Sequence, residues 1–181
     1  MQVHPEWKTT GDSYNIRSAN CEELRLLQEI ERAAGQLFIN TDYPFVATGE
    51  PIRYELLYRQ YELGMVWVAS DPGNAPVGFA VALPLDGLLH LEEIAVHPSH
   101  GKRGIGTKLV NAVCEWAKQK GYRAITLSTF RDIAWNGPFY SRLGFVVLTE
   151  SELSDGLREV KEKEAVNGLP VKDRVCMRLD L

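Results

Sequence analysis

The stretch "HPSHGKRGIGTKLV", residues 97–110, places three glycines and three basic side chains between two apolar runs. The run that leads into it, residues 87–98, has the composition of a strand, and the run that follows has apolar residues at helical spacing. Glycines after a strand let the backbone aim several N–H groups at one anion, and the next helix adds the positive end of its dipole. Lys102, Arg103 and Lys108 add positive charge. The stretch therefore predicts a strand, a turn and a helix that hold a pyrophosphate.

Two familiar phosphate-binding motifs do not account for this turn. A P-loop requires G-x-x-x-x-G-K-[ST], but here the second glycine of that spacing is followed by Thr107 and then Lys108, the reverse order. A dinucleotide-binding turn requires G-x-G-x-x-G, and although Gly104 and Gly106 fit it, Leu109 stands at the last glycine position. A turn that only reverses the chain would not need three basic residues, so we expect it to bind an anion.

The composition favours one domain with a small anionic ligand. The 181 residues, 45% of them apolar, suffice for a single domain over 1–181 and are too few for two ordinary ones. A net charge of −4 argues against a nucleic-acid-binding protein. No apolar run approaches the roughly 20 residues of a membrane span, and residues 1–10 lack the layout of a secretory signal, so we expect a cytoplasmic protein. Three widely spaced cysteines predict neither a disulfide framework nor a metal site.

The pattern along the chain predicts a mixed α/β domain. A helix links the strands expected at 87–98 and 122–130, so these two should be parallel with a right-handed crossover, whereas the strands before them should be antiparallel. Residues 152–170 are charged and punctuated by glycine, which indicates a solvated loop or a loose helix. The remaining strands are expected at 14–19, 65–70, 76–86, 146–151 and 173–181, and helices at 20–38, 52–64, 106–121 and 135–145.

The segment "LEEIAVHPSHGKRGIGTKLV" resembles the acetyl-CoA-binding motif of the GNAT superfamily of N-acetyltransferases. The segment "WNGPFYSRLGF" is similar to a downstream motif of the same family, and the expected order of elements from 14–19 to 146–151 matches the family's fold. The resemblance covers most of the chain. It implies a GNAT-like, mostly antiparallel central sheet with one parallel βαβ crossover, at which the fourth and fifth strands splay apart.

The resemblance also implies which residues bind acetyl-CoA, with no metal ion involved. Two residues of the fourth strand would bond the pantetheine arm through their main chain, a set in the glycine turn would surround the pyrophosphate, and an asparagine would follow the fifth strand. Two positions depart from the family pattern: the first loop position, usually Gln or Arg, is Gly101, and the usual asparagine position falls on Ile133. The implied residues are Ile94 and Val96, then Lys102, Arg103, Gly104, Ile105, Gly106 and Thr107, and finally Asn136.

Acetyl transfer to an amine needs a base and an acid. An alkyl ammonium with a pKa of about 10 must lose a proton before it attacks, and a thiolate with a pKa of about 8.5 leaves best when it is protonated. Tyr140 stands where many relatives keep the tyrosine proposed as the acid, and His90 and Glu92 stand where relatives place a base. Without a bulge, His90, Glu92 and Ile94 would share one face of the strand and Glu93 the other. Removal of the proton by bulk water remains the alternative.

The acceptor is expected over the splayed strands. Four aromatic residues could form its walls, although a tyrosine stripe at helical spacing also fits simple core packing: Tyr43, Phe45, Tyr54 and Trp135. The favoured function is transfer of acetyl from acetyl-CoA to a primary amine of a small molecule or peptide, by direct attack in a ternary complex. The alternatives are another acyl donor or a non-catalytic acyl-CoA sensor. By resemblance to relatives, the last strands could also form a homodimer contact.

Overall fold

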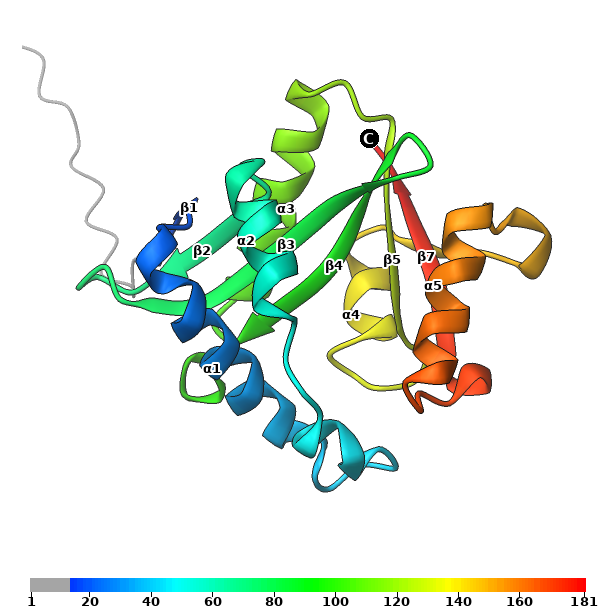
Figure 1. Cartoon of the computed structure of the whole chain (residues 1–181), viewed down its shortest axis with the longest axis horizontal. Helices are drawn as coiled ribbons and strands as arrows, with labels where there is room; N and C mark the ends of the chain where they lie inside the picture. The colour runs from blue at the N-terminus through cyan, green and yellow to red at the C-terminus, as the bar shows by residue number, and fades with distance from the viewer. Residues whose placement is uncertain (1–13) are drawn as a thin grey trace, which may run out of the picture.

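The computed structural model describes residues 14–181, so the N-terminal segment considered above for a secretory signal lies outside the described residues. Its centre is a mixed sheet of seven strands in the order β1-β2-β3-β4-β5-β7-β6, in which only β4 and β5 are parallel (Figure 1). This confirms the expected topology. The strands are β1 (Asn15–Ser18), β2 (Val66–Ser70), β3 (Pro76–Leu85), β4 (Leu88–Val96), β5 (Ala124–Phe130), β6 (Val146–Val147) and β7 (Arg174–Asp180).

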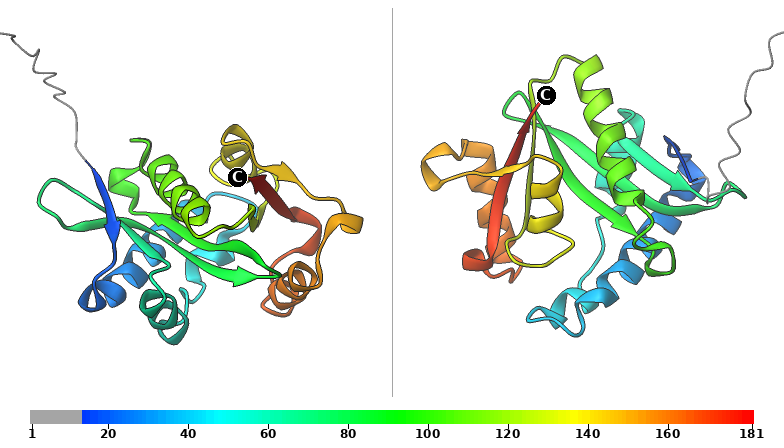
Figure 2. Two further views of the ribbon diagram at one scale, coloured as in Figure 1. Left: turned by 90° about the horizontal axis from the view of Figure 1, so that it is seen from above. Right: turned by 180° about the vertical axis from the view of Figure 1, so that it is seen from behind.

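Helices cover both faces of the sheet. Figure 2 shows α3 and α4 on one face and α1, α2 and α5 on the other. The apolar stripe of α3 faces the sheet, and Leu109, Val110 and Val113 are each at most 1% exposed. Full burial of such a side chain contributes about 1.5–3 kcal/mol, so this stripe fixes α3 against the strands. The helices are α1 (Leu24–Gly35), α2 (Tyr54–Glu62), α3 (Ile105–Gln119), α4 (Gly137–Arg142) and α5 (Asp155–Val166).

The sheet is split between β4 and β5. These strands pair only over Leu89–Leu91 and Ile125–Leu127, and beyond that point they diverge into the V visible in Figure 1. The rest of β5 stays with β7, because all seven residues of β5 pair with residues of that strand. The expected splay of the fourth and fifth strands is therefore confirmed.

A bulge in β4 changes which side chains face the same way. Val81 of β3 pairs with Glu93. The next residue of β3 pairs with the β4 residue two positions before Glu93, so Glu92 is left as the extra residue of the bulge. Glu93 consequently lies on the face of Val81, which packs toward α1 and α2, and His90 lies on this face too. Ile94 pairs with a β3 residue that faces α3. The expectation that His90, Glu92 and Ile94 share a face opposite Glu93 is wrong, because the bulge shifts the alternation by one residue.

The chain also differs from the expected elements near its C-terminus. The charged segment forms a regular helix, α5, whose first turn is capped by Ser154, with its Oγ accepting from the Leu157 N–H at 3.4 Å. Leu157 is buried together with Leu153 and Cys176, so a small apolar cluster holds the helix against β7. The strand expected at 146–151 contains only the two residues of β6. No helix among residues 14–181 is long and apolar enough to cross a membrane.

Candidate functional site

Beyond Leu91, the edge of β4 that faces β5 carries main-chain groups that pair with no strand. Opposed residues in an antiparallel pair alternate between hydrogen-bonded and non-hydrogen-bonded positions. The N–H of His97 donates to the carbonyl of Val77 at 2.8 Å, so His97 stands at a hydrogen-bonded position of the β3–β4 pair. Glu93, four residues earlier, also stands at such a position, and both residues direct their main-chain N–H and C=O groups toward β3. Ile94 and Val96 therefore turn theirs toward β5, which has already diverged. An extended ligand could pair with this edge as a strand would.

The glycine turn leads into α3 with a left-handed backbone. Lys102 has φ +60° and Gly104 has φ +75°, and the second of these positions favours a residue without a Cβ. The N–H groups of the first turn of a helix have no partner within the helix, so those of Ile105, Gly106 and Thr107 are directed to the N-terminal end of α3. The Ile105 side chain is buried in the core, so only its main chain can contact a ligand. The arrangement suits an anion.

Three side chains around the turn contact one residue at the start of β1, Tyr14. The Arg103 guanidinium donates to the Tyr14 hydroxyl at 3.0 Å, and His100 Nδ1 lies 2.9 Å from the same oxygen. Lys108 Nζ donates to the Tyr14 main-chain oxygen at 3.3 Å. Tyr14 lies more than eighty positions earlier in the chain, and nothing in the sequence pattern pointed to it.

A group of carboxyl side chains that the sequence pattern did not indicate lies where β4 and β5 begin to diverge. Glu93 Oε1 accepts from the N–H of Ile94 at 3.0 Å, and both oxygens of Glu31 on α1 accept from the N–H of Ile52, at 3.1 and 3.0 Å. Burial raises the pKa of Glu31 to about 7, and burial together with the charges of Glu31 and Glu92 holds the pKa of Glu93 well above its usual range. Helical spacing could have indicated that Glu31 is shielded from solvent, because this glutamate stands on the apolar stripe of α1.

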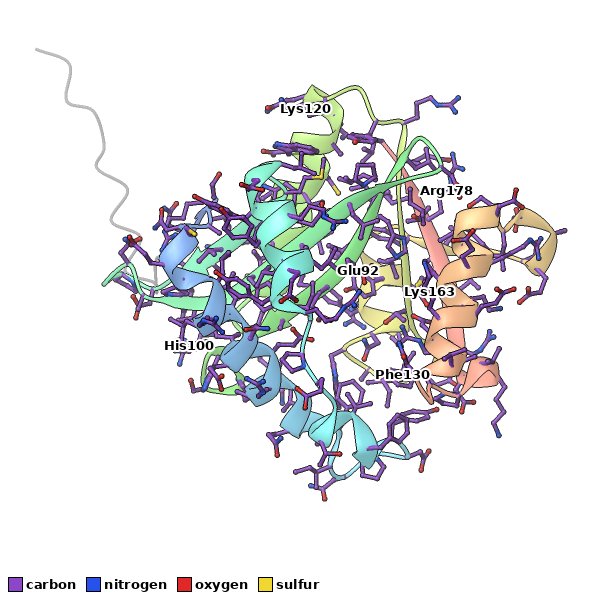
Figure 3. The ribbon with its side chains drawn as sticks, in the orientation of Figure 1. Glu92, His100, Lys120, Phe130, Lys163 and Arg178 are labelled. Carbon is purple, nitrogen blue, oxygen red and sulfur yellow. The ribbon has the colours of Figure 1, made fainter. Side chains whose placement is uncertain are left out.

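His90 and Glu92 lie together as expected, in different surroundings. His90 is 2% exposed, its Nδ1 lies 2.9 Å from Thr126 Oγ1 on β5, and its Nε2 lies 3.9 Å from Glu92 Oε2. Burial lowers the pKa of His90 to about 4, so the ring is neutral at neutral pH. Burial, with the charge of Glu164, raises the pKa of Glu92. Figure 3 shows Glu92 at the gap between the diverging strands β4 and β5, across from Lys163 of α5.

Tyr140 is buried on α4, on the other side of the gap. Burial raises the pKa of its hydroxyl, the charge of Glu93 raises that pKa further, and the charge of Arg174 lowers it. The phenol is therefore protonated at neutral pH. The start of α4 is fixed by a close approach to the chain leaving β5, because a Cβ on Gly137 would lie 2.2 Å from the main-chain oxygen of Arg131.

Asn136 stands immediately before α4. Its Nδ2 donates to Thr129 Oγ1 at 2.9 Å, whereas its Oδ1 is buried without a hydrogen-bond partner among the described residues. Leaving a buried acceptor unpaired costs about 1–3 kcal/mol, so this oxygen is suited to receive a donor from a ligand.

Two of the four expected aromatic wall residues meet beside the gap. Tyr43 and Phe45 line an open hollow of about 570 Å³, and the Tyr43 ring stacks on Phe130 at the end of β5, with centroids 4.3 Å apart. Trp135 instead packs against Phe38, near the same strand end. Tyr54 lies on α2 against Arg25, away from the hollow. Figure 3 marks Phe130 at the C-terminal end of β5. The other residues lining the hollow are Asp42, Asp132, Ile133, Pro170, Lys172 and Asp173.

Within residues 14–181, no group of three or more His, Cys, Asp and Glu side chains is placed to hold a metal ion. The chemistry available at the gap is that of an open strand edge, an anion-binding helix start, partly buried carboxyl groups and a buried phenol.

Comparison with known proteins points to one family. A model of the acetyltransferase (GNAT) family matches residues 25–145. An uncharacterised N-acetyltransferase of Methanocaldococcus jannaschii is 39% identical over 100 residues, which cover 50% of this chain and 42% of that protein. The chain thus aligns with less than half the length of that relative.

Solved structures share the fold. The PaiA N-acetyltransferase of Thermoplasma acidophilum in complex with coenzyme A superposes with a TM-score of 0.71 at 18% identity, covering 93% of this chain and 99% of that one. The N-acetylglutamate synthase of Neisseria gonorrhoeae, complexed with coenzyme A and N-acetyl-glutamate, gives 0.70 at 16% identity and covers 95% of this chain and 36% of that one.

Proposed function

Because the chain belongs to the GNAT family of acetyltransferases, we propose that it transfers the acetyl group of acetyl-CoA to a primary amine of a small molecule or peptide. The observation that carries the proposal is the unpaired edge of β4 leading directly into the glycine turn. One extended molecule that begins with a thioester arm and ends in phosphates fits both features at once. The proposal includes direct attack of the amine in a ternary complex.

The coenzyme would be held mostly by main-chain groups. The carbonyl of Ile94, whose N–H already donates to Glu93, and the main chain of Val96 would pair with the amides of the pantetheine arm, and the N–H groups of Gly104 to Thr107 would surround the pyrophosphate. The lone Oδ1 of Asn136 supports a contact to a donor of the coenzyme. Lys102 and Arg103 would supply the positive charge that balances the phosphates.

The reacting groups would lie on the two sides of the V. The amine nitrogen attacks the thioester carbon, the carbon–sulfur bond breaks, the amine gives up a proton and the sulfur receives one. Tyr140 is proposed to give its hydroxyl proton to the sulfur, since the phenol is protonated at neutral pH.

The proton leaving the amine is proposed to pass to a carboxylate at the β4 bulge. Glu92 and Glu93 both have a raised pKa, which makes them stronger bases than ordinary glutamates. His90 was expected to share this role, but a pKa of about 4 makes it a weak proton acceptor. In our proposal His90 stays neutral, bonded to Thr126, and positions Glu92 from 3.9 Å away.

The surroundings of the gap support a cationic acceptor. Asp42, Asp132 and Asp173 line the hollow beside it, where Tyr43 and Phe45 provide apolar walls. An alkyl ammonium would be attracted by these carboxylates and then lose its proton next to Glu93. In this proposal Tyr54 and Trp135 contribute less, since neither lines the hollow.

Two measurements on the purified chain test the proposal. Calorimetry with acetyl-CoA and with CoA should give micromolar binding, and a thiol-release assay over amino acids, amino sugars, diamines and peptides should show turnover with one amine class. Absence of coenzyme binding would overturn the proposed function, whereas binding without turnover on any amine would favour a non-catalytic acyl-CoA sensor.

A matched pair of glycine variants makes the binding test specific. Gly104 and Gly87 have φ +75° and +74°, and a Cβ at either meets nothing within 4 Å, so both Ala variants carry the same backbone strain. Gly104→Ala should weaken acetyl-CoA binding, because it alters the turn at the start of α3. Gly87→Ala, in the turn between β3 and β4, should lose similar stability and bind normally.

A further inference from the structure

We infer that Tyr14 is a positioning residue of the coenzyme site, an inference that rests on the function proposed above. Its hydroxyl contacts His100 and Arg103, which stand on the two sides of the turn at residues 101–102. One side-chain oxygen atom, from the residue just before β1, thus joins both ends of the turn. Figure 3 marks His100 beyond the end of β4.

The hydrogen bonds around the hydroxyl have a defined direction. A guanidinium can only donate, so the Tyr14 oxygen accepts from Arg103. The hydroxyl proton is then available to His100 Nδ1, 2.9 Å away, and a neutral imidazole that accepts at Nδ1 carries its proton on Nε2. Tyr14 therefore leaves the Nε2–H of His100 as the remaining donor of that ring and holds the Arg103 side chain in one position.

The same residue also holds the first turn of α3. Lys108 Nζ donates to the Tyr14 main-chain oxygen at 3.3 Å, which holds a second cationic side chain, beside that of Arg103, at the turn. Tyr14 can act as a fixed point, since it is 7% exposed and belongs to the apolar core under α3. Its ring also meets the His100 ring edge to face, with centroids 5.7 Å apart.

The expected consequence is stronger binding of phosphate groups. Long cationic side chains lose conformational freedom when they bind an anion, and side chains already held in place lose less. The proposal is that Tyr14 prepares His100, Arg103 and Lys108 for the phosphates of acetyl-CoA and has no part in the chemical step, which occurs at the far end of the pantetheine arm.

The test is Tyr14→Phe, which keeps the buried ring and removes only the hydroxyl. We expect the KM and Kd for acetyl-CoA to rise about tenfold, a loss of the size expected when a long cationic side chain must be ordered on binding, with kcat unchanged at saturation. With S-acetylpantetheine, which lacks all phosphates, wild type and variant should have the same KM. Tyr122→Phe, which removes the same atom beyond the other end of α3, is the matched control and should change neither substrate.

A double-mutant cycle separates this role from general destabilisation. Arg103→Met alone should weaken acetyl-CoA binding, and adding Tyr14→Phe should cost less than it does in the wild type, because the two side chains act together. Additive losses, an equal loss with S-acetylpantetheine, or unchanged acetyl-CoA binding in Tyr14→Phe would each overturn the inference while leaving the proposed function intact. Failure of the wild type itself to bind acetyl-CoA would instead overturn the proposed function, and the inference with it.

Discussion

Replacing Glu31 by Gln should stabilise the protein above neutral pH. Burial raises the pKa of this carboxyl from 4.5 to about 7, so its ionised form is about 3 kcal/mol less favourable in the folded protein than in the unfolded chain. Between these two values the folded state binds more protons than the unfolded state. The free energy of unfolding contributed by Glu31 therefore falls as pH rises from about 4.5 to about 7, and the full penalty remains at higher pH.

The Glu31→Gln variant removes the buried charge and keeps an oxygen that can accept from the N–H of Ile52. We expect the variant to exceed the wild type by about 1–3 kcal/mol at pH 8 and to equal it at pH 4, where the wild-type carboxyl is protonated in both states. The gain includes a contribution from Glu93, whose pKa is raised partly by the charge of Glu31.

Urea unfolding at pH 4, 6 and 8 measures this difference directly. The control is Glu29→Gln on the same helix, whose side chain is 64% exposed and which should shift stability little at any of these pH values. If Glu31→Gln is no more stable than the wild type at pH 8, or if its advantage is equally large at pH 4, then the buried carboxylate is not the source of the penalty and the reasoning fails.

Three further predictions concern the gap. Tyr140→Phe should lower kcat about a hundredfold and leave the KM for acetyl-CoA unchanged, since the ring packing is kept; steady-state kinetics that match the wild type would exclude the phenol as the acid. Glu93→Gln should lower kcat more than Glu92→Gln, because the Glu92 side chain is 34% exposed. Glu93→Gln should also abolish the rise of kcat/KM that the wild type shows as pH passes the raised pKa of Glu93. An unaltered pH profile would exclude Glu93 as the base. Gly137→Ala should lose about 1–3 kcal/mol or more, because its Cβ would lie 2.2 Å from a main-chain oxygen; Gly73→Ala, which meets only a flexible side chain, serves as the control in thermal melts.

The sequence predicted the elements that carry a strong periodic pattern. The stripe of α3 and the alternation of strands with turn residues predicted the order of elements along the chain and the parallel pair of β4 and β5, whereas the place of β7 between β5 and β6 was not predicted. The helix expected at 20–38 ends earlier: the chain leaves α-helical geometry after Gly35, and Leu37 is 46% exposed. Helix α5 was left open because its apolar contacts are few and its charged residues fit a solvated loop equally well.

The sequence predicted only those parts of the candidate site that main-chain groups form. The glycine turn and the edge of β4 follow from local spacing, whereas the bulge at Glu92 depends on the register with β3, which a strand's own sequence does not reveal. Tyr14 and Glu31 reach the site from other elements through tertiary contacts. No pattern in its own segment marks Tyr14, and the place of Glu31 on the apolar stripe of α1 indicates burial without showing which residues it meets.

The split between β4 and β5 gives this sheet an edge in its interior. An exposed outer edge is a hazard, because its unpaired groups can recruit a strand of another molecule and start aggregation. The edge at Ile94 and Val96 lies inside the sheet, with helical layers above and below it (Figure 2). Because β5 and β7 continue the sheet beyond the gap, a neighbouring sheet has no outer edge here to extend. The fold thus keeps the hydrogen-bonding capacity of a free strand and shields it from self-association.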